Sequence, residues 1–107
     1  MMIKGSERRS LKPLKGVHRE TLVWGTRAML VKFKIEKGAL IPEHSHFHEQ
    51  IGVVFKGKLK LRIEGKEFML GEGDSYLVPS NAPHSAEAVE EVVVVDCFSP
   101  PREDYKE

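Results

Sequence analysis

Hydrophobic and polar residues alternate over short stretches along most of the chain, a pattern typical of β-strands that bury one face. The longest such stretch, residues 27–36, carries on its apolar face Met29, Val31, Phe33 and Ile35. Residues 58–64 repeat the pattern with Leu59, Leu61 and Ile63. Because successive side chains of a strand point to opposite sides, both stretches predict strands with one face toward a core.

Other parts of the chain are also rich in strand-forming residues. These stretches are residues 21–24, 51–55, 67–70, 75–78 and 92–98. The stretches 51–55, 75–78 and 92–98 are more continuously apolar, which favours strands that are buried more evenly. A tight hairpin turn is predicted at residues 64–66, where Gly65 can adopt a positive φ.

The chain is expected to fold as one all-β domain. Its 107 residues suffice for a single hydrophobic core, and no repeat or linker divides them. We therefore assign residues 1–107 to one domain that begins with an N-terminal arm, residues 1–18. Turn residues recur about every 8–12 residues, and about eight strands in a double-sheet barrel would close such a fold. A helix is compatible only with the first fifteen residues and with residues 102–106.

Composition removes several classes of function. The net charge is +1 and charges of both signs are interspersed, so neither nucleic acid nor an anionic membrane is expected as a partner. Basic residues are denser in the first nineteen positions, which we interpret as a solvated arm. The chain has neither the ~18-residue apolar run of a membrane helix nor a signal-peptide pattern, so a cytoplasmic location is expected. Cys97 is the only cysteine, which excludes an internal disulfide and a cysteine-based zinc cluster.

Four of the five histidines lie between residues 44 and 84. Imidazole is the commonest metal ligand among side chains. The imidazoles of His44, His46 and His84, together with the amide oxygen of Gln50, could surround a single divalent ion. The His-x-His pair does not establish such a site by itself, because alternating histidines also occur on solvated strand faces.

The spacing of these residues resembles the two sequence motifs of the cupin family. The first motif corresponds to Gly38, His44-Ser45-His46, Gln50 and Gly57. The second corresponds to Gly73, Pro79, Asn81 and His84. The resemblance covers residues 28–98, which are then the barrel core. It implies a cupin double-stranded β-helix, a jelly-roll barrel, with one divalent transition metal (Zn, Ni, Mn or Fe) bound by His44, His46, Gln50 and His84.

The sequence departs from the family pattern at Gln50, Asn81 and Ala88, where glutamate, glycine and asparagine are usual. Asparagine tolerates the positive φ that glycine would supply. A neutral Gln50 would leave the metal its full positive charge, as a stronger Lewis acid able to bind an anionic substrate oxygen. In the alternative interpretation, three histidines hold the ion and Gln50 only forms a hydrogen bond in the barrel mouth.

His48 needs a separate interpretation. In an unbroken strand it would share the face of His44, His46 and Gln50. All of these together with His84 would leave no open coordination position, and in cupins with a similar run the third histidine usually lies outside the coordination sphere. We therefore expect His48 to lie outside it, while a ligand role stays open.

The C-terminal segment, residues 96–104, resembles the tail of the small pectin-degradation cupins of the KdgF type, which also carry a glutamine in place of the metal-binding glutamate. Those proteins convert 4,5-unsaturated uronate monosaccharides into linear keto sugars. The resemblance implies that Asp96 is an acid/base, that Arg102 is catalytic and grips the substrate carboxylate, and that Phe98 is a pocket wall. Alternatively, Asp96 caps a turn, Arg102 lies at the surface or in a dimer contact, and Phe98 belongs to the core. Tyr76 could line the barrel too, but for it we favour core packing.

Three functions are compatible with the sequence. We favour a metal-dependent, isomerase-like enzyme that linearises unsaturated uronates, with an anionic sugar as its small-molecule substrate. The alternatives are a dioxygenase-type cupin and a non-catalytic sugar- or ligand-binding cupin. A homodimer is also expected, because an open sandwich this short has edges to cover and residues 21–24 offer a strand for exchange.

Overall fold

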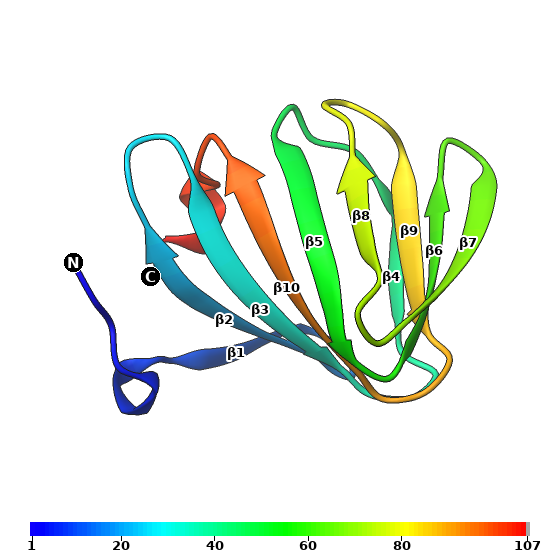
Figure 1. Cartoon of the computed structure of the whole chain (residues 1–107), viewed down its shortest axis with the longest axis horizontal. Coiled ribbons are helices and arrows are strands. Elements are labelled where there is room, and N and C mark those ends of the chain that lie inside the picture. The colour runs from blue at the N-terminus through cyan, green and yellow to red at the C-terminus, as the bar shows by residue number, and fades with distance from the viewer. Residues whose placement is uncertain (107) are drawn as a thin grey trace.

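A computed structural model describes residues 1–106 of the chain; Glu107, the last residue of the predicted domain, lies outside the described residues. The described residues form ten strands: β1 (Ser10–Leu14), β2 (Val17–Trp24), β3 (Met29–Ile35), β4 (Leu40–His44), β5 (Glu49–Lys56), β6 (Lys58–Ile63), β7 (Lys66–Gly71), β8 (Ser75–Val78), β9 (His84–Ala88) and β10 (Val92–Ser99). One sheet has the order β1-β2-β3-β10-β5-β8 and the other the order β4-β9-β6-β7 (Figure 1). The predicted all-β jelly roll is confirmed, with its neighbouring strands antiparallel.

The core lies between the two sheets and follows the predicted alternation. Along β3 every second residue is buried, with Val31 fully enclosed. From the other sheet, Leu59 and Leu61 of β6 point into the same core. Burying one face of each sheet in this way removes these apolar side chains from water, the main driving force of folding.

β5 and β8 do not show the even burial that their composition suggested. Ile51 on β5 is 52% exposed and Leu77 on β8 is 50% exposed. Gln50 and Gly52, on the other face of β5, are buried. The expectation was wrong because only the inner face of the six-stranded sheet packs against the second sheet, so the apolar side chains of Ile51 and Leu77 on the outer face stay exposed.

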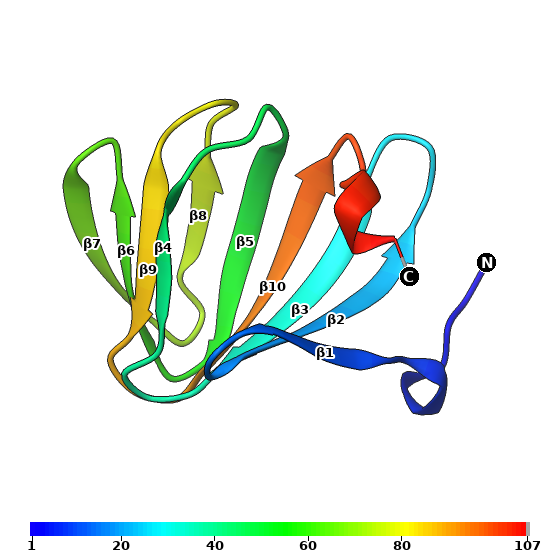
Figure 2. The ribbon, with the colours of Figure 1, turned by 180° about the vertical axis from the view of Figure 1, so that it is seen from behind.

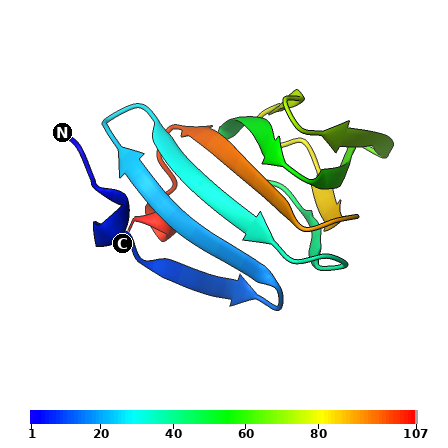
Figure 3. The same cartoon turned by 60° about the horizontal axis from the view of Figure 1, so that its bottom comes forward.

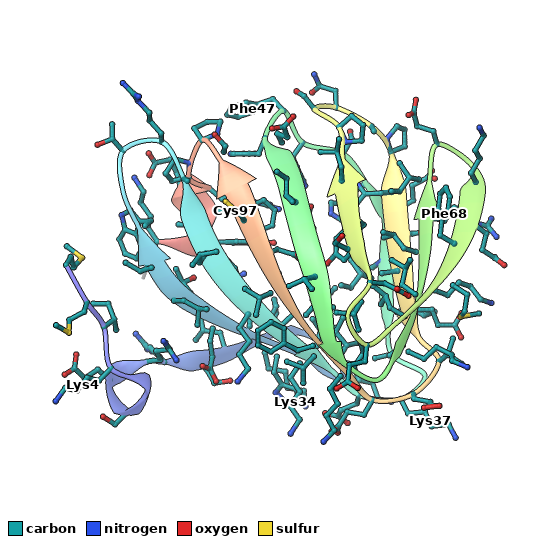
Figure 4. The ribbon with its side chains drawn as sticks, in the orientation of Figure 1. Lys4, Lys34, Lys37, Phe47, Phe68 and Cys97 are labelled. Carbon is teal, nitrogen blue, oxygen red and sulfur yellow. The ribbon has the colours of Figure 1, made fainter. Side chains whose placement is uncertain are left out.

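An apolar row crosses the outer face of the six-stranded sheet. Leu30 pairs with Val23 on one side and with Cys97 on the other, and the row continues through Ile51 to Leu77. We call Val23, Leu30, Cys97, Ile51 and Leu77 the outer row. Figure 4 shows Cys97 in the middle of it, on β10.

The N-terminal residues contribute strands to the six-stranded sheet. β1 lies within the predicted arm, residues 1–18, and pairs with β2. β2 begins at Val17 and lies between β1 and β3, so residues 21–24 are not an edge strand. Figure 3 shows β1 and β2 running alongside β3. Short 3-10 helices, Gly5–Glu7 and Glu103–Tyr105, occupy the two places where a helix was expected.

Two local predictions about the backbone are confirmed. β6 and β7 are joined by Glu64 and Gly65, with φ of 50° and 79°, which is the positive-φ pair of a tight hairpin turn. Asn81, in place of the family's glycine, adopts a φ of 65°.

No helix in residues 1–106 is long and apolar enough to cross a membrane.

Candidate metal centre and adjoining cavity

The pairing of β4 with β9 brings the two histidine motifs together. His44, the last residue of β4, lies directly opposite His84, the first residue of β9, and their ring centroids are 4.2 Å apart. His46 follows in the loop that leads to β5. One ring nitrogen from each of these three histidines lies within 4.8 Å of the other two. Residues 40 apart in sequence therefore form one cluster at the end of the sandwich where β10 ends and the C-terminal 3-10 helix begins (Figure 2).

The backbone fixes the orientation of all three imidazoles. In each, Nδ1 lies against a main-chain carbonyl oxygen two residues away, at 2.8 Å for His44, 3.0 Å for His46 and 2.9 Å for His84. The acceptors are the carbonyls of Pro42, His48 and Ala82. Because a carbonyl only accepts, Nδ1 carries the hydrogen and Nε2 of the neutral ring presents a lone pair. This is the arrangement by which proteins usually orient histidine ligands of a metal.

Gln50 adds an oxygen to the same cluster. Its Nε2 donates a 3.0 Å hydrogen bond to Oδ2 of Asp96, so its Oε1 points the other way and lies 3.2 Å from Nε2 of His46. With the His46 hydrogen on Nδ1, two lone pairs face each other across that gap. A cation satisfies two such acceptors, so the donor set of three imidazoles and one amide oxygen fits a divalent metal.

Burial favours the neutral, metal-binding form of His46 and His84. Desolvation lowers the pKa of His84 to about 4, with the neighbouring His44 and His46 adding to the shift. Desolvation also lowers the pKa of His46, and the positive charge of Arg102 acts in the same direction. No proton has to be displaced from these rings at neutral pH before an ion binds.

Asp96 is deeply buried beside this cluster, with 2% of its surface exposed. Its Oδ1 accepts a short hydrogen bond from the hydroxyl of Tyr76, and its Oδ2 accepts the bond from Gln50. Burial raises the pKa of Asp96 to about 7, while both hydrogen bonds act to lower it. A carboxyl that titrates near neutrality beside a cavity is suited to give and take protons.

A cavity of about 320 Å³ connects Asp96 to the C-terminal segment. Phe98 is 1% exposed and serves both predicted roles, since it belongs to the core and also lines this cavity. The Arg102 guanidinium lies 4.0 Å from the Tyr105 ring centre and 5.3 Å from that of Phe98. Asp104 holds the same guanidinium by two hydrogen bonds, at 3.0 and 3.3 Å. Arg102 is thus a half-buried, preoriented cation at the cavity wall.

His48 lies outside the histidine cluster. The chain leaves the strand conformation between β4 and β5, so the even spacing that would have aligned His48 with His46 is lost. Its ring instead stacks on Phe47, with the centroids 4.0 Å apart. Figure 4 shows Phe47 in the loop before β5. The main-chain carbonyl of His48, and not its side chain, serves the site by orienting His46.

Two residues have roles at the site that the sequence interpretation missed. Tyr76 packs against the core, as favoured, and in addition lines the cavity and donates its hydroxyl to Asp96. Arg19, counted with the solvated basic residues, lines the cavity, and its guanidinium lies 4.1 Å from the ring centre of Tyr105. The alternation of Val17, Arg19 and Thr21 was the available signal, because it places Arg19 on the inward face of β2.

Known proteins share this fold and sequence. A family model described as a cupin domain matches residues 31–98. The pectin degradation protein KdgF of Dickeya dadantii (strain 3937) is 36% identical to this chain over 92 residues, which cover 84% of each protein. The chain therefore belongs to the cupin family, and within it to the relatives of KdgF.

Solved structures extend the likeness to almost the whole chain. The structure of KdgF from Halomonas sp. matches with a TM-score of 0.93 and 30% identity, over 99% of this chain and 98% of that one. An RmlC-like cupin from Shewanella frigidimarina NCIMB 400 gives a TM-score of 0.93 and 30% identity, over 98% and 95% of the two chains. The N-terminal strands β1 and β2, which lie outside the family match, thus belong to the shared fold.

Proposed function

We propose that this protein is a metal-dependent enzyme that converts 4,5-unsaturated uronate monosaccharides into linear keto sugars. The observation that carries the proposal is a single cavity lined by three of the four proposed metal ligands (His44, Gln50 and His84), a buried carboxyl and an oriented arginine. The relationship to KdgF, a pectin degradation protein, supports this choice of substrate class.

In the proposed site His44, His46, His84 and Gln50 hold one divalent ion. When bound, such an ion supplies Lewis-acid stabilisation of a negatively charged substrate oxygen. With no ligand charge to offset it, its positive charge is fully available to the substrate. Both Zn and Ni, as well as Mn and Fe, suit this set of ligands.

Arg102 and Asp96 have separate roles in the proposed reaction, substrate binding and proton transfer. Arg102 binds the substrate carboxylate, a pairing that its planar guanidinium favours. Ring opening breaks the bond between C1 and the ring oxygen, as the anomeric hydroxyl loses a proton and the ring oxygen gains one. The resulting enol becomes a ketone when its hydroxyl loses a proton and C4 gains one. Asp96, with a pKa raised to about 7, is the group we assign to these proton transfers.

The proposal is tested by incubating metal-loaded protein with 4,5-unsaturated galacturonate and following the loss of enol-ether absorbance. We expect loss well above the spontaneous rate. Asp96→Asn should lower kcat by about 10²–10⁴-fold, the usual contribution of general acid–base catalysis. Arg102→Ala should lower kcat/KM by about 10–100-fold, because a hydrogen bond to a charged group contributes about 1.5–3 kcal/mol.

Two exposed residues provide matched controls. Glu72→Gln removes an exposed carboxylate and Arg62→Ala an exposed guanidinium, and both should leave the rate unchanged. A wild-type rate no faster than the uncatalysed reaction, with each of the four metals, would refute the proposed activity. Consumption of oxygen during turnover would instead favour the dioxygenase alternative.

We further propose that two copies of the chain pair through the outer row. Exchange of residues 21–24 is disfavoured, because β2 is already paired on both sides. The outer row is a continuous apolar band, and such bands on a protein surface mark interaction sites. Lys34 and Glu49 lie on this face toward opposite ends of β10, opposite Val93 and Ser99. A two-fold axis would therefore bring Lys34 of each copy toward Glu49 of the other, so the partner that fits this face is a second copy.

A further inference from the structure

The carboxylate of Asp96 is held in place by residues of two neighbouring strands. Asp96 on β10, Gly52 on β5 and Tyr76 on β8 lie directly opposite one another in the sheet and all face inward. A Cβ at residue 52 would overlap both the Asp96 carboxylate and the Tyr76 ring. Glycine at this position therefore lets Tyr76 reach across β5 and donate its hydroxyl to Asp96.

This carboxylate determines which end of the Gln50 amide faces the histidines. Oδ2 of Asp96 accepts a hydrogen bond from the amide, and only the NH₂ end of an amide can donate one. Gln50 Nε2 therefore donates the 3.0 Å hydrogen bond to Asp96 Oδ2, and Oε1 at the other end of the amide points at His46. Rotation of the amide by half a turn would bring two NH₂ hydrogens to the place where a cation binds.

We propose that Asp96, anchored by Tyr76, is a positioning residue for the metal: it acts through Gln50 by holding the amide oxygen toward the three histidines. The same contact gives a physical reason for the neutral residue at position 50. A glutamate there would set a second carboxylate against Asp96, whereas glutamine offers a donor to one side and an oxygen to the other. This role is separate from proton transfer and rests only on the metal site of the proposed function.

A double-mutant cycle on zinc affinity tests the proposal without any sugar. Zn²⁺ binding to metal-free protein is measured by competition with a chromophoric chelator, for the wild type, Asp96→Ala, Gln50→Ala and the double variant. We expect Asp96→Ala to weaken zinc binding by about 10–100-fold, as loss of a residue that orients a metal ligand usually does. In the Gln50→Ala background, Asp96→Ala should weaken zinc binding by less than about a tenth of the fold-change that it causes when Gln50 is present, because the two residues act as one unit.

Tyr76→Phe supplies a milder variant that removes only one hydroxyl from the interior. It should weaken zinc binding less than Asp96→Ala does, and only when Gln50 is present. Glu72→Gln, at an exposed carboxylate, should have no effect. Circular dichroism of each variant identifies any that does not fold. If Asp96→Ala does not fold, the double-mutant cycle of Tyr76→Phe and Gln50→Ala on zinc affinity tests the proposal in its place.

Equal losses of zinc affinity from Asp96→Ala with and without Gln50 would overturn the positioning role, as would no loss at all. A wild type that binds no zinc would overturn this role together with the metal site. If Asp96 and Gln50 show the expected coupling in zinc affinity but the protein does not consume unsaturated uronates, the positioning role stands and only the proposed reaction is refuted.

Discussion

At the scale of single residues, the most consequential environment is that of Asp96. It is a carboxyl with only 2% of its surface exposed, and its two hydrogen-bond donors come from the neighbouring strand β5 and from β8, the strand beyond it. Burial disfavours its charge, while Tyr76 and Gln50 favour it, and burial is the larger effect. The result is a group poised between its two protonation states near neutral pH, in the same site as His46 and His84, whose pKa values burial lowers.

This environment makes the stability of the metal-free protein depend on pH. Because the pKa of Asp96 is raised from 3.8 to about 7, the folded protein retains a proton that the unfolded chain releases above about pH 4. The wild type should therefore lose free energy of unfolding, relative to Asp96→Asn, as pH rises from about 4 to about 7. Above that range the difference between the two should stay constant.

Urea unfolding of both proteins at a series of pH values, with a chelator present, measures this difference. The contribution of the buried histidines is the same in both proteins and cancels. A difference that does not change with pH would show that Asp96 titrates alike in the folded and unfolded states. The exposed-site variant Glu72→Gln is the reference for a carboxylate outside the cavity.

At the scale of elements, the hairpin between β6 and β7 shows how a local sequence determines a register. Ile63 and Lys66 are paired, so only two residues make the turn, and both have positive φ. Turns of this kind match the twist of the two strands, and they require residues that tolerate the left-handed region. Gly65 meets that requirement without strain, and Glu64 meets it at some cost.

Substitutions in this turn should therefore change stability in opposite directions. Gly65→Val should lower the free energy of unfolding by about 1–2 kcal/mol, the cost of a left-handed conformation for a residue with a Cβ. Glu64→Asn should raise it, because asparagine enters that region more readily. Gly71→Ala, at a strand glycine with space for a Cβ and no positive φ, is the control. Urea midpoints measure all three, and a neutral Gly65→Val would contradict the turn geometry.

β4 and β9 matter more for the site than the hairpin does, yet their sequences did not reveal them. Residues 40–44 contain a proline and residues 84–88 are mostly small or polar, so neither stretch shows clear alternation. Their pairing comes from tertiary packing. It is this pairing that places His44 opposite His84.

At the scale of the whole molecule, the outer row leaves an apolar face on the six-stranded sheet. A homodimer through this face should have twice the mass of one chain by light scattering at micromolar concentration. Ile51→Glu puts a charge within the row, next to Cys97, and should give a monomer, because an unpaired charge is costly to bury in an interface.

Phe68→Glu provides the control for this experiment, because Phe68 is 44% exposed on β7 of the other sheet (Figure 4). It should leave the mass of the dimer unchanged. A wild type with the mass of one chain would refute the homodimer. A dimer that survives Ile51→Glu but not Phe68→Glu would place the interface on the four-stranded sheet.

The sequence alone determined the β-class, the strands with clear alternation, the hairpin and the histidine motifs. These features follow from short-range rules, since a period of two, a positive-φ turn and a spaced motif can all be read within a dozen residues. The family resemblance then supplied the expectation that Asp96, Phe98 and Arg102 belong to one site. All three line the same cavity.

Only the tertiary structure determined which contacts connect those residues to the rest of the site. Tyr76, Gly52 and Asp96 meet because three strands align them across a sheet, and no local pattern contains that alignment. The same holds for the break in the chain that removes His48 from the cluster. Which face of a strand is buried depends on what packs against it, and that partner is distant in sequence. The chemistry of the ligands was therefore readable from the chain, while their orientation was not.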